Sequence, residues 1–329
     1  MSIPKIIHYC WLSGEPYPED IQRCIDSWHK YMPDYKFKLW DMKTFDSSRW
    51  KYTSEALSRR KYAFVSDVVR LYALYTEGGI YLDSDIEVYK SFDSLLDNPA
   101  FSCMESGGRF AAWLMASEPS NPLFKELLSY YDAKSFLRED GSMDLTPNTI
   151  PTTRILSKYG MVPVNKLQEL ERITIYPEDY FCPKNPWTGK VQITNNTYAM
   201  HLFAGAWNDT AEDDLKFFGN VSAFVSDTIN KERFNENISC YVFGTGTVGN
   251  LVFEALRMNG VEPGGFIVTK REMAWKDIDG IPIYELPECN DEIKKACVLV
   301  SVLPSGQNVI RDSLLKNGFT NILCIGDDK

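Results

Sequence analysis

The sequence lacks the patterns of several protein classes. Its 329 residues hold three histidines and eight cysteines with no CxxC pair, so neither a zinc knuckle nor a disulfide framework is indicated. No apolar run approaches the ~18–20 residues that cross a bilayer, and the N-terminal MSIPKIIHYCW has no charged segment before a long apolar one. We therefore expect a cytoplasmic protein with reduced thiols, and we expect Cys240 and Cys324, which lie in apolar runs, to be buried.

An excess of positive charge is also missing. The formal net charge of −10 argues against a protein that neutralises nucleic-acid phosphates with a basic face. Aromatic residues, in contrast, make up 13% of the chain, and such residues build cores as well as stacking platforms for bases and sugars. At about 150 residues per domain, the length predicts two domains.

The first part of the chain reads as alternating strands and helices. An apolar run over residues 3–12 holds His8 and Trp11, and we expect a strand there. A helix capped by Asp20 and a strand over residues 35–41 follow. Residues 54–77 predict one long helix that the Gly78–Gly79 pair ends, and the apolar segment GIYL predicts a strand directly after it. This order predicts an α/β domain over residues 1–235.

A polar, charged stretch over residues 225–239 separates a second domain, residues 236–329, which reads as a small Rossmann-like α/β unit. Gly244, Gly246 and Gly249 follow its first strand and open a helix, as a phosphate-binding turn requires. The next strand ends in Lys270 and Arg271 instead of an acid, which speaks against NAD. Ligand binding by this turn and a purely structural module both stay open.

Two acidic patterns in the first domain predict chemistry. Asp67 and Arg70 share a helix face, either as a surface ion pair or as a cleft pair that binds sugar hydroxyls and phosphate. Asp83 and Asp85 flank a serine at the end of an apolar strand. Two such carboxylates form a solvated turn or bind a divalent cation, which would stabilise a diphosphate leaving group. The cation interpretation points to transfer of a sugar from a nucleotide.

Three ordered segments, IPKIIHYCWLSG, YAFVSDVVRLYALYTEGGIYLDSDIEVY and YAMHLFAGAW, resemble the DXD-containing sugar transferases of glycosyltransferase family 32. The resemblance covers roughly residues 1–210 and extends distantly to the catalytic domain of the large clostridial glucosylating toxins. It implies a glycosyltransferase A-type nucleotide-binding α/β sandwich, with Mn²⁺ or Mg²⁺ as cofactor and with retention at the anomeric carbon.

The resemblance also implies roles for individual residues. Trp11 would stack on the base, Tyr81 would line the nucleotide pocket, and Asp67 and Arg70 would contact donor sugar and phosphates. Asp83 and Asp85 would serve the metal and the ribose, so that the candidate catalytic residues are Asp67, Arg70, Asp83 and Asp85.

Further along the chain the motifs are looser. His201 would lie by the metal and Trp207 would donate to phosphate, although a core histidine is the alternative at position 201. Asn148, Thr149 and Arg154 are candidates for the acceptor site, with an ordinary loop and helix cap as the alternative. His8 and His29 are expected to be structural.

Together these patterns predict a retaining, metal-dependent glycosyltransferase. It would move a hexose from a UDP-sugar, or else from GDP-mannose, to a glycan or lipid-linked glycan acceptor in capsular or surface polysaccharide synthesis. A non-catalytic nucleotide-sugar-binding protein and an NADP-dependent sugar oxidoreductase working through the turn at Gly244–Gly249 are the alternatives. Peripheral membrane association and oligomeric state stay open.

Overall fold

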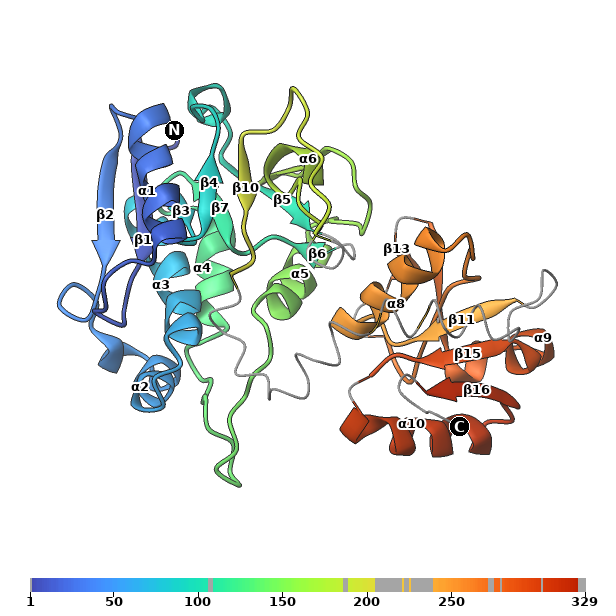
Figure 1. Cartoon of the computed structure of the whole chain (residues 1–329). Coiled ribbons are helices and arrows are strands. Elements are labelled where there is room, and N and C mark those ends of the chain that lie inside the picture. The colour runs from blue at the N-terminus through green and yellow to red at the C-terminus, as the bar shows by residue number, and fades with distance from the viewer. Residues whose placement is uncertain are drawn as a thin grey trace. The chain divides into compact units, whose positions relative to one another are not determined.

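The computed structural model describes residues 2–105, 109–185, 189–204, 221, 225, 239–271, 275–278, 280–302 and 304–324. The chain divides into two compact units, Met1–Pro186 with Lys190–Asn208 and Trp187–Gly189 with Asp209–Lys329. The predicted boundary between residues 235 and 236 lies outside the described residues and stays a prediction. Each unit is an α/β structure of its own (Figure 1).

The first unit is built on a mixed sheet in which three neighbouring strands are parallel and the next is antiparallel. Its order is β2 (Lys36–Trp40), β1 (Ile6–Cys10), β3 (Gly79–Leu82), β7 (Leu114–Ser117), β5 (Ala100–Glu105), β9 (Thr174–Tyr176) and β8 (Gln168–Glu169), with β6 (Arg109–Phe110) paired to β5. A separate two-stranded ladder joins β4 (Ile86–Val88) to β10 (Ala199–His201). The turn between β3 and β4 is the Asp83–Asp85 segment.

Helices cover both faces of this sheet, as an α/β sandwich requires. They are α1 (Glu19–Tyr31), α2 (Lys51–Ser58), α3 (Tyr62–Glu77), α4 (Pro122–Ser129), α5 (Thr149–Lys158) and α6 (Glu178–Phe181). Successive side chains of a strand point to opposite faces. In β3, Ile80 and Leu82 join the core cluster that contains Trp28 of α1, whereas the ring of Tyr81 lies under the guanidinium of Arg70 from α3. The predicted α/β sandwich is confirmed.

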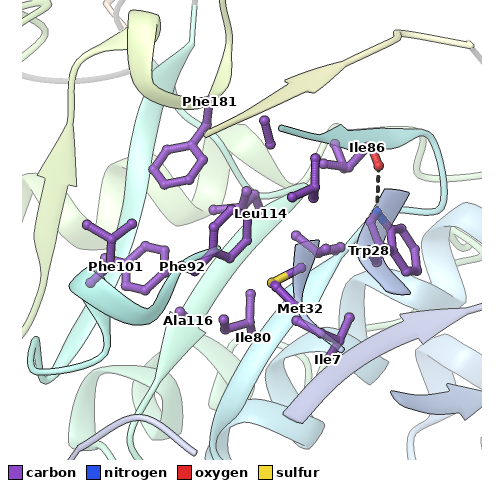
Figure 2. Packing of buried hydrophobic residues seen from close by; sticks show 14 of the residues in the cluster. Ile7, Trp28, Met32, Ile80, Ile86, Phe92, Phe101, Leu114, Ala116 and Phe181 are labelled. Atoms are coloured by element: carbon purple, nitrogen blue, oxygen red, sulfur yellow. Dashed lines mark hydrogen bonds between the residues drawn. The ribbon is translucent and has the colours of Figure 1, made fainter. Parts of the chain in front are cut away.

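The core on the α1 side is rich in aromatic rings (Figure 2). Trp28 is fully buried and donates its indole N–H to the carbonyl of Ile86, at 2.6 Å. This bond satisfies a polar group that would otherwise be buried without a partner. It also ties the strand that follows Asp85 to helix α1.

The expected helix over residues 54–77 is wrong in one respect, because it is two helices. Helix α2 ends at Ser58, and Arg60 adopts the left-handed conformation with φ of 57°. The N–H groups of Arg60 and Lys61 bond to the carbonyls of Leu57 and Ala56, which is the Schellman pattern. The helix end was not predicted because arginine stands where glycine is usual.

The predicted cap of the first helix is also wrong, since α1 begins at Glu19 with Pro18 before it. Asp20 lies in the first turn instead, where its carboxylate accepts the N–H of Ile21 at 3.0 Å. An acidic group there still favours the helix, because the N-terminus carries partial positive charge.

The glycine pair ends α3 as predicted. Gly78 has φ of 67° and its N–H bonds to Leu74, while Gly79 has φ of 101° and a Cβ there would lie 2.7 Å from the carbonyl oxygen of Ile6. His8 packs beside this turn, with Nδ1 accepting the indole N–H of Trp40 at 3.1 Å and Nε2 lying 2.9 Å from the carbonyl of Gly78. Because Nδ1 accepts, Nε2 carries the hydrogen and donates it. The structural interpretation of His8 is confirmed.

The second unit is a largely parallel sheet. Its order is β13 (Asp277–Ile278), β14 (Ile281–Glu285), β12 (Phe266–Val268), β11 (Cys240–Phe243), β15 (Cys297–Val300) and β16 (Asn321–Cys324). Its described helices include α8 (Thr247–Met258), α9 (Asp291–Lys295) and α10 (Pro304–Lys316). Every pairing from β14 to β16 is parallel, which confirms the predicted Rossmann-like arrangement. Cys240 and Cys324 are buried as expected, and among the described helices none is long and apolar enough to cross a membrane.

Candidate functional site

The candidate residues gather at one edge of the first sheet. Strands β1, β2 and β3 are parallel, so their carboxyl ends lie at the same edge, where α/β proteins bind ligands. Trp11 follows β1 and its N–H bonds to the carbonyl of Trp40, the last residue of β2. Asp83 follows β3. Trp11 and Asp83, which are far apart in the sequence, therefore both lie at this edge of the sheet.

The buried side chain of Arg70 links two carboxylates, that of Asp67 on helix α3 and that of Asp83 after strand β3. Arg70 is 4% exposed, and its Nη2 lies 3.2 Å from Oδ1 of Asp67 and 3.1 Å from Oδ1 of Asp83. Its Nη1 donates to the carbonyl of Ala112 at 2.6 Å, and Nε donates to the carbonyl of Ser66. The surface-pair alternative for Asp67 and Arg70 is therefore wrong, because the guanidinium is a buried cation held by five acceptor atoms.

Two further side chains orient these carboxylates. The hydroxyl of Tyr81 donates to Oδ1 of Asp83 at 2.9 Å, and Tyr81 itself is only 1% exposed. Asn148, at the start of α5, donates its amide N–H to Oδ1 of Asp67 at 2.7 Å. The sequence makes Asn148 a candidate for the site that binds the glycan acceptor. In the structure its side chain is a hydrogen-bond partner of Asp67.

A second cluster brings together Asp83, Asp85 and His201, whose ligand atoms lie within 4.8 Å of one another. Strand β10 pairs with β4 so that His201 is opposite Ile86, which places its Nε2 3.2 Å from Oδ1 of Asp85. The backbone N–H of Ala204 donates to the other oxygen, Oδ2, at 2.9 Å. The structure thus brings the two aspartates and His201 together, and their binding of a metal stays a prediction.

Burial and charge act differently on the three carboxylates. Burial raises the pKa of Asp67 to about 7, against the opposing charge of Arg70. Burial likewise raises the pKa of Asp83, with Arg70 opposing it and Asp85 adding to it. Burial alone would raise the pKa of Asp85 too, but the charge and hydrogen bond of His201 and the N–H of Ala204 hold it below its ordinary value. Neighbouring acids with divergent pKa values are typical of functional sites.

The donor set fits a divalent cation. Two carboxylates and an imidazole are ligands that Mn²⁺ and Mg²⁺ sites use, with the nitrogen favouring the transition metal. Nδ1 of His201 is buried and has no hydrogen-bond partner among the described residues. A cation beside the aspartates would face the other nitrogen, Nε2, which lies 3.2 Å from Oδ1 of Asp85, so the fit rests on the two carboxylates and Nε2. The fit supports Asp83, Asp85 and His201 as the residues that would hold a metal.

One part of the site was not found from the sequence. Residues 111–113 form the turn between β6 and β7, and the N–H of Asp83 bonds to the carbonyl of Trp113 at 2.9 Å. The ring of Trp113 lies against that of His201, with centroids 4.6 Å apart. The indole N–H donates to Glu105 at the end of β5, at 3.0 Å. The spacing of residues in the sequence does not predict these contacts, because they depend on the antiparallel pairing of β7 with β3.

The remaining candidates keep the status of predictions. Trp11 packs edge-on against Tyr17 and donates its indole N–H to the carbonyl of Glu15, so stacking on a base stays a prediction. Trp207 lies outside the described residues. Arg154 lines a surface pocket of about 300 Å³ between α4 and α5. Thr149 is the first residue of α5, and an acceptor contact by either residue stays a prediction.

The glycine turn of the second unit has a clear packing role. Gly244 has φ of 105°, and a Cβ on Gly249 would lie 2.0 Å from the carbonyl oxygen of Gly244. Glycine at 249 therefore lets α8 approach the end of β11. Arg271 contacts Glu288 and the carbonyl of Ile283, so its guanidinium is engaged within the unit. Ligand binding at Gly244, Gly246 and Gly249 stays a prediction.

Comparison with solved structures gives weak likenesses. The glycosyltransferase PaToxG superposes with a TM-score of 0.36 at 23% sequence identity, over 48% of this chain and 69% of that one. The α/β assignment therefore rests on the strand order of the chain itself.

Comparison of sequences is more specific. Inositol phosphoceramide mannosyltransferase 3 of Schizosaccharomyces pombe is 36% identical over 108 residues, which are 30% of this chain and 29% of that protein. Mannosyl phosphorylinositol ceramide synthase SUR1 of Saccharomyces cerevisiae is 30% identical over 145 residues, 41% of this chain and 37% of that protein. The chain thus spans about a third of the length of these curated relatives. Residues 18–102 match the family model described as "Glycosyltransferase sugar-binding region containing DXD motif", and the paired aspartates Asp83 and Asp85 lie within the matched stretch.

Proposed function

We propose that the chain transfers a sugar from a nucleotide-sugar donor to a glycan or lipid-linked glycan acceptor in a metal-dependent reaction. The observation that carries this proposal is the convergence of Asp83, Asp85 and His201 at the sheet edge that also holds Arg70 and Asp67. A divalent cation bound there would neutralise the diphosphate leaving group. The cytoplasm, and capsular or surface polysaccharide synthesis, are the setting that we propose for it.

The protein groups have separable roles in this proposal. Arg70 holds Asp67 and Asp83 in fixed positions, because its guanidinium is itself fixed by the carbonyls of Ala112 and Ser66. Asp67 uses Oδ1 for both Arg70 and Asn148, which leaves Oδ2 as the oxygen that we assign to a hydroxyl of the donor sugar. Carboxylates can accept several hydrogen bonds, so both uses are compatible.

We assign retention at the anomeric carbon, as the family resemblance implies. In this step the acceptor hydroxyl oxygen bonds to the anomeric carbon on the face from which the diphosphate departs. The bond from that carbon to the phosphate oxygen breaks, and the departing oxygen takes the proton of the hydroxyl. An anomeric configuration read by NMR from the product tests this assignment, and an inverted product would refute it.

Donor hydrolysis tests the proposal without knowledge of the acceptor. The purified chain is incubated with Mn²⁺ and with UDP-glucose, UDP-galactose, UDP-N-acetylhexosamines or GDP-mannose, and release of the nucleoside diphosphate is measured. The names of the relatives favour a mannosyl donor, whereas the resemblance of the motifs favours a UDP-sugar. We expect hydrolysis of at least one donor and its loss when EDTA removes the metal.

Matched variants sharpen the test. Asp83→Asn and Asp85→Asn should each lower the rate at least about 100-fold, because a metal ion contributes several kcal/mol of charge stabilisation. Asp97→Asn removes an exposed carboxylate of the same type and should leave the rate unchanged. Silence with every donor would refute catalysis, and binding of a nucleotide without hydrolysis would favour the non-catalytic alternative. Full metal-dependent turnover by Asp85→Asn would refute the role of that residue.

A further inference from the structure

The turn over residues 111–113 contacts three functional groups that come from three different elements. The carbonyl of Ala112 accepts from Nη1 of Arg70 at 2.6 Å, and the carbonyl of Trp113 accepts the N–H of Asp83 at 2.9 Å. The indole ring of Trp113 lies against the imidazole of His201, with centroids 4.6 Å apart and ring planes 34° apart. One short segment therefore holds a residue of helix α3, the residue after β3 and a residue of β10.

His201 has an unusual need for such support. A histidine that binds metal is ordinarily oriented by a hydrogen bond from its other ring nitrogen. Nε2 of His201 lies 3.2 Å from Asp85, and Nδ1 is buried with no hydrogen-bond partner in the described part of the chain. Ring contacts with Trp113 and with Phe203, whose centroid is 4.0 Å away, are what remain to fix the imidazole plane.

The orientation of Trp113 is itself determined. The residue is 5% exposed, and its indole N–H donates to Oε2 of Glu105 at 3.0 Å. A buried indole N–H without an acceptor would cost free energy, so rotation of the ring away from Glu105 is disfavoured. The chain of contacts runs from Glu105 through Trp113 to His201 and then to Asp85.

We propose that Trp113 is a positioning residue for the cation site, and that Glu105 sets the orientation of its indole ring. The inference rests on the proposed function in one respect, since it takes Asp83, Asp85 and His201 as cation ligands. Trp113 acts on two of them, through its backbone carbonyl on Asp83 and through its ring on His201. Only the second contact is sensitive to the side chain, which makes it accessible to substitution.

The chain offers a matched control for this substitution. Trp50 is also buried, and its indole N–H also donates to a carboxylate, that of Asp132, at 3.1 Å. Trp113→Phe and Trp50→Phe therefore remove the same bond and the same volume. Mn²⁺ binding to the full chain is measured for each by calorimetry and by the loss of the free Mn²⁺ signal in electron paramagnetic resonance.

We expect Trp113→Phe to bind Mn²⁺ about tenfold or more weakly, since loss of an outer partner of a metal ligand usually costs 10- to 100-fold in affinity. Trp50→Phe should stay within about twofold of the unsubstituted chain on the same scale. Glu105→Ala should weaken Mn²⁺ binding with Trp113 still in place, and Glu105→Gln, which keeps an acceptor oxygen for the indole, should restore most of it.

The outcomes separate this inference from the proposed function. Unchanged Mn²⁺ affinity in Trp113→Phe, in a protein that hydrolyses a donor, overturns the positioning role and leaves the function standing. Weakened Mn²⁺ affinity in Trp113→Phe, with unchanged affinity in Trp50→Phe, supports the positioning role even if no donor is hydrolysed. Equal losses in Trp113→Phe and Trp50→Phe, equal losses in Glu105→Ala and Glu105→Gln, or no Mn²⁺ binding by the unsubstituted chain would each overturn it.

Discussion

Replacing Arg70 with methionine removes a buried cation and keeps most of the side-chain volume. Two carboxylates that lie 3.2 and 3.1 Å from the guanidinium would lose their counter-charge, and the carbonyl of Ala112 would lose its donor. Removing one partner of a buried ion pair typically costs about 3–5 kcal/mol, because an uncompensated charge stays behind. We expect the free energy of unfolding of the first unit to fall by about this amount.

The assay is urea denaturation followed by tryptophan fluorescence. Five of the eight tryptophans, Trp11, Trp28, Trp40, Trp50 and Trp113, are described residues of the first unit, so the signal reports mainly on that unit. Arg23→Met is the control, because Arg23 lies 3.6 Å from Glu87 with a side chain that is 56% exposed. Such surface pairs are worth about 0–1 kcal/mol.

A double variant tests the physical cause. Arg70→Met combined with Asp83→Asn removes one of the stranded charges, and it should be less destabilised than the sum of the single variants, with a coupling of about 0.5–3 kcal/mol. Arg70→Lys keeps the charge but loses the forked geometry, and it should fall between the unsubstituted chain and Arg70→Met. A loss below about 1 kcal/mol for Arg70→Met, equal to that expected for Arg23→Met, would refute the reasoning.

The remaining predictions concern the turn between α3 and β3. Gly79→Ala should lower the free energy of unfolding by more than Gly160→Ala does. Both residues have positive φ, but of the two only Gly79 would place a Cβ against backbone, 2.7 Å from the carbonyl oxygen of Ile6. We expect about 1–3 kcal/mol from backbone strain alone, and equal losses for the two variants in urea denaturation would contradict a role for the contact with Ile6. Burial lowers the pKa of His8, so the unfolded chain binds a proton at a pH at which the folded chain does not. The free energy of unfolding should therefore fall as the pH drops below about 6.5 towards the pKa of His8 in the folded chain. His8→Gln should flatten this dependence between pH 7 and pH 5, and identical slopes of urea midpoint against pH in both proteins would exclude His8 as its source.

The part of the site that could be predicted from the sequence is the part made by neighbours in the chain. Asp67 and Arg70 share a helix face, and Asp83 follows from the strand that begins directly after the helix. Local periodicity and one turn therefore sufficed to bring them together. His201 was placed by its motif and by the family resemblance, because no local pattern connects it to Asp85.

Other contacts had no signal in the sequence. The roles of Glu105, Ala112 and Trp113 depend on how β5, β6 and β7 pair, and strand pairing is decided by burial over the whole sheet rather than by a few residues. The break between α2 and α3 was missed for a different reason. Arg60 adopts a conformation that glycine usually occupies, so residue type alone predicted a continuous helix.

Two hydrogen bonds at the cation site close chain loops of very different length, one on the arm made by α3 and β3 and one on the arm that carries His201. Arg70 and Asp83 are 13 residues apart, whereas the N–H of Ala204 reaches the carboxylate of Asp85 across 119 residues. Closing the longer loop costs about 2 kcal/mol more in chain entropy, because that cost grows with the logarithm of loop length. The helix and strand that carry Asp67, Arg70 and Asp83 can thus assemble early in folding. We therefore expect the arm that carries His201 to dock later than this helix and strand, so that the complete cation site forms only when this arm is in place.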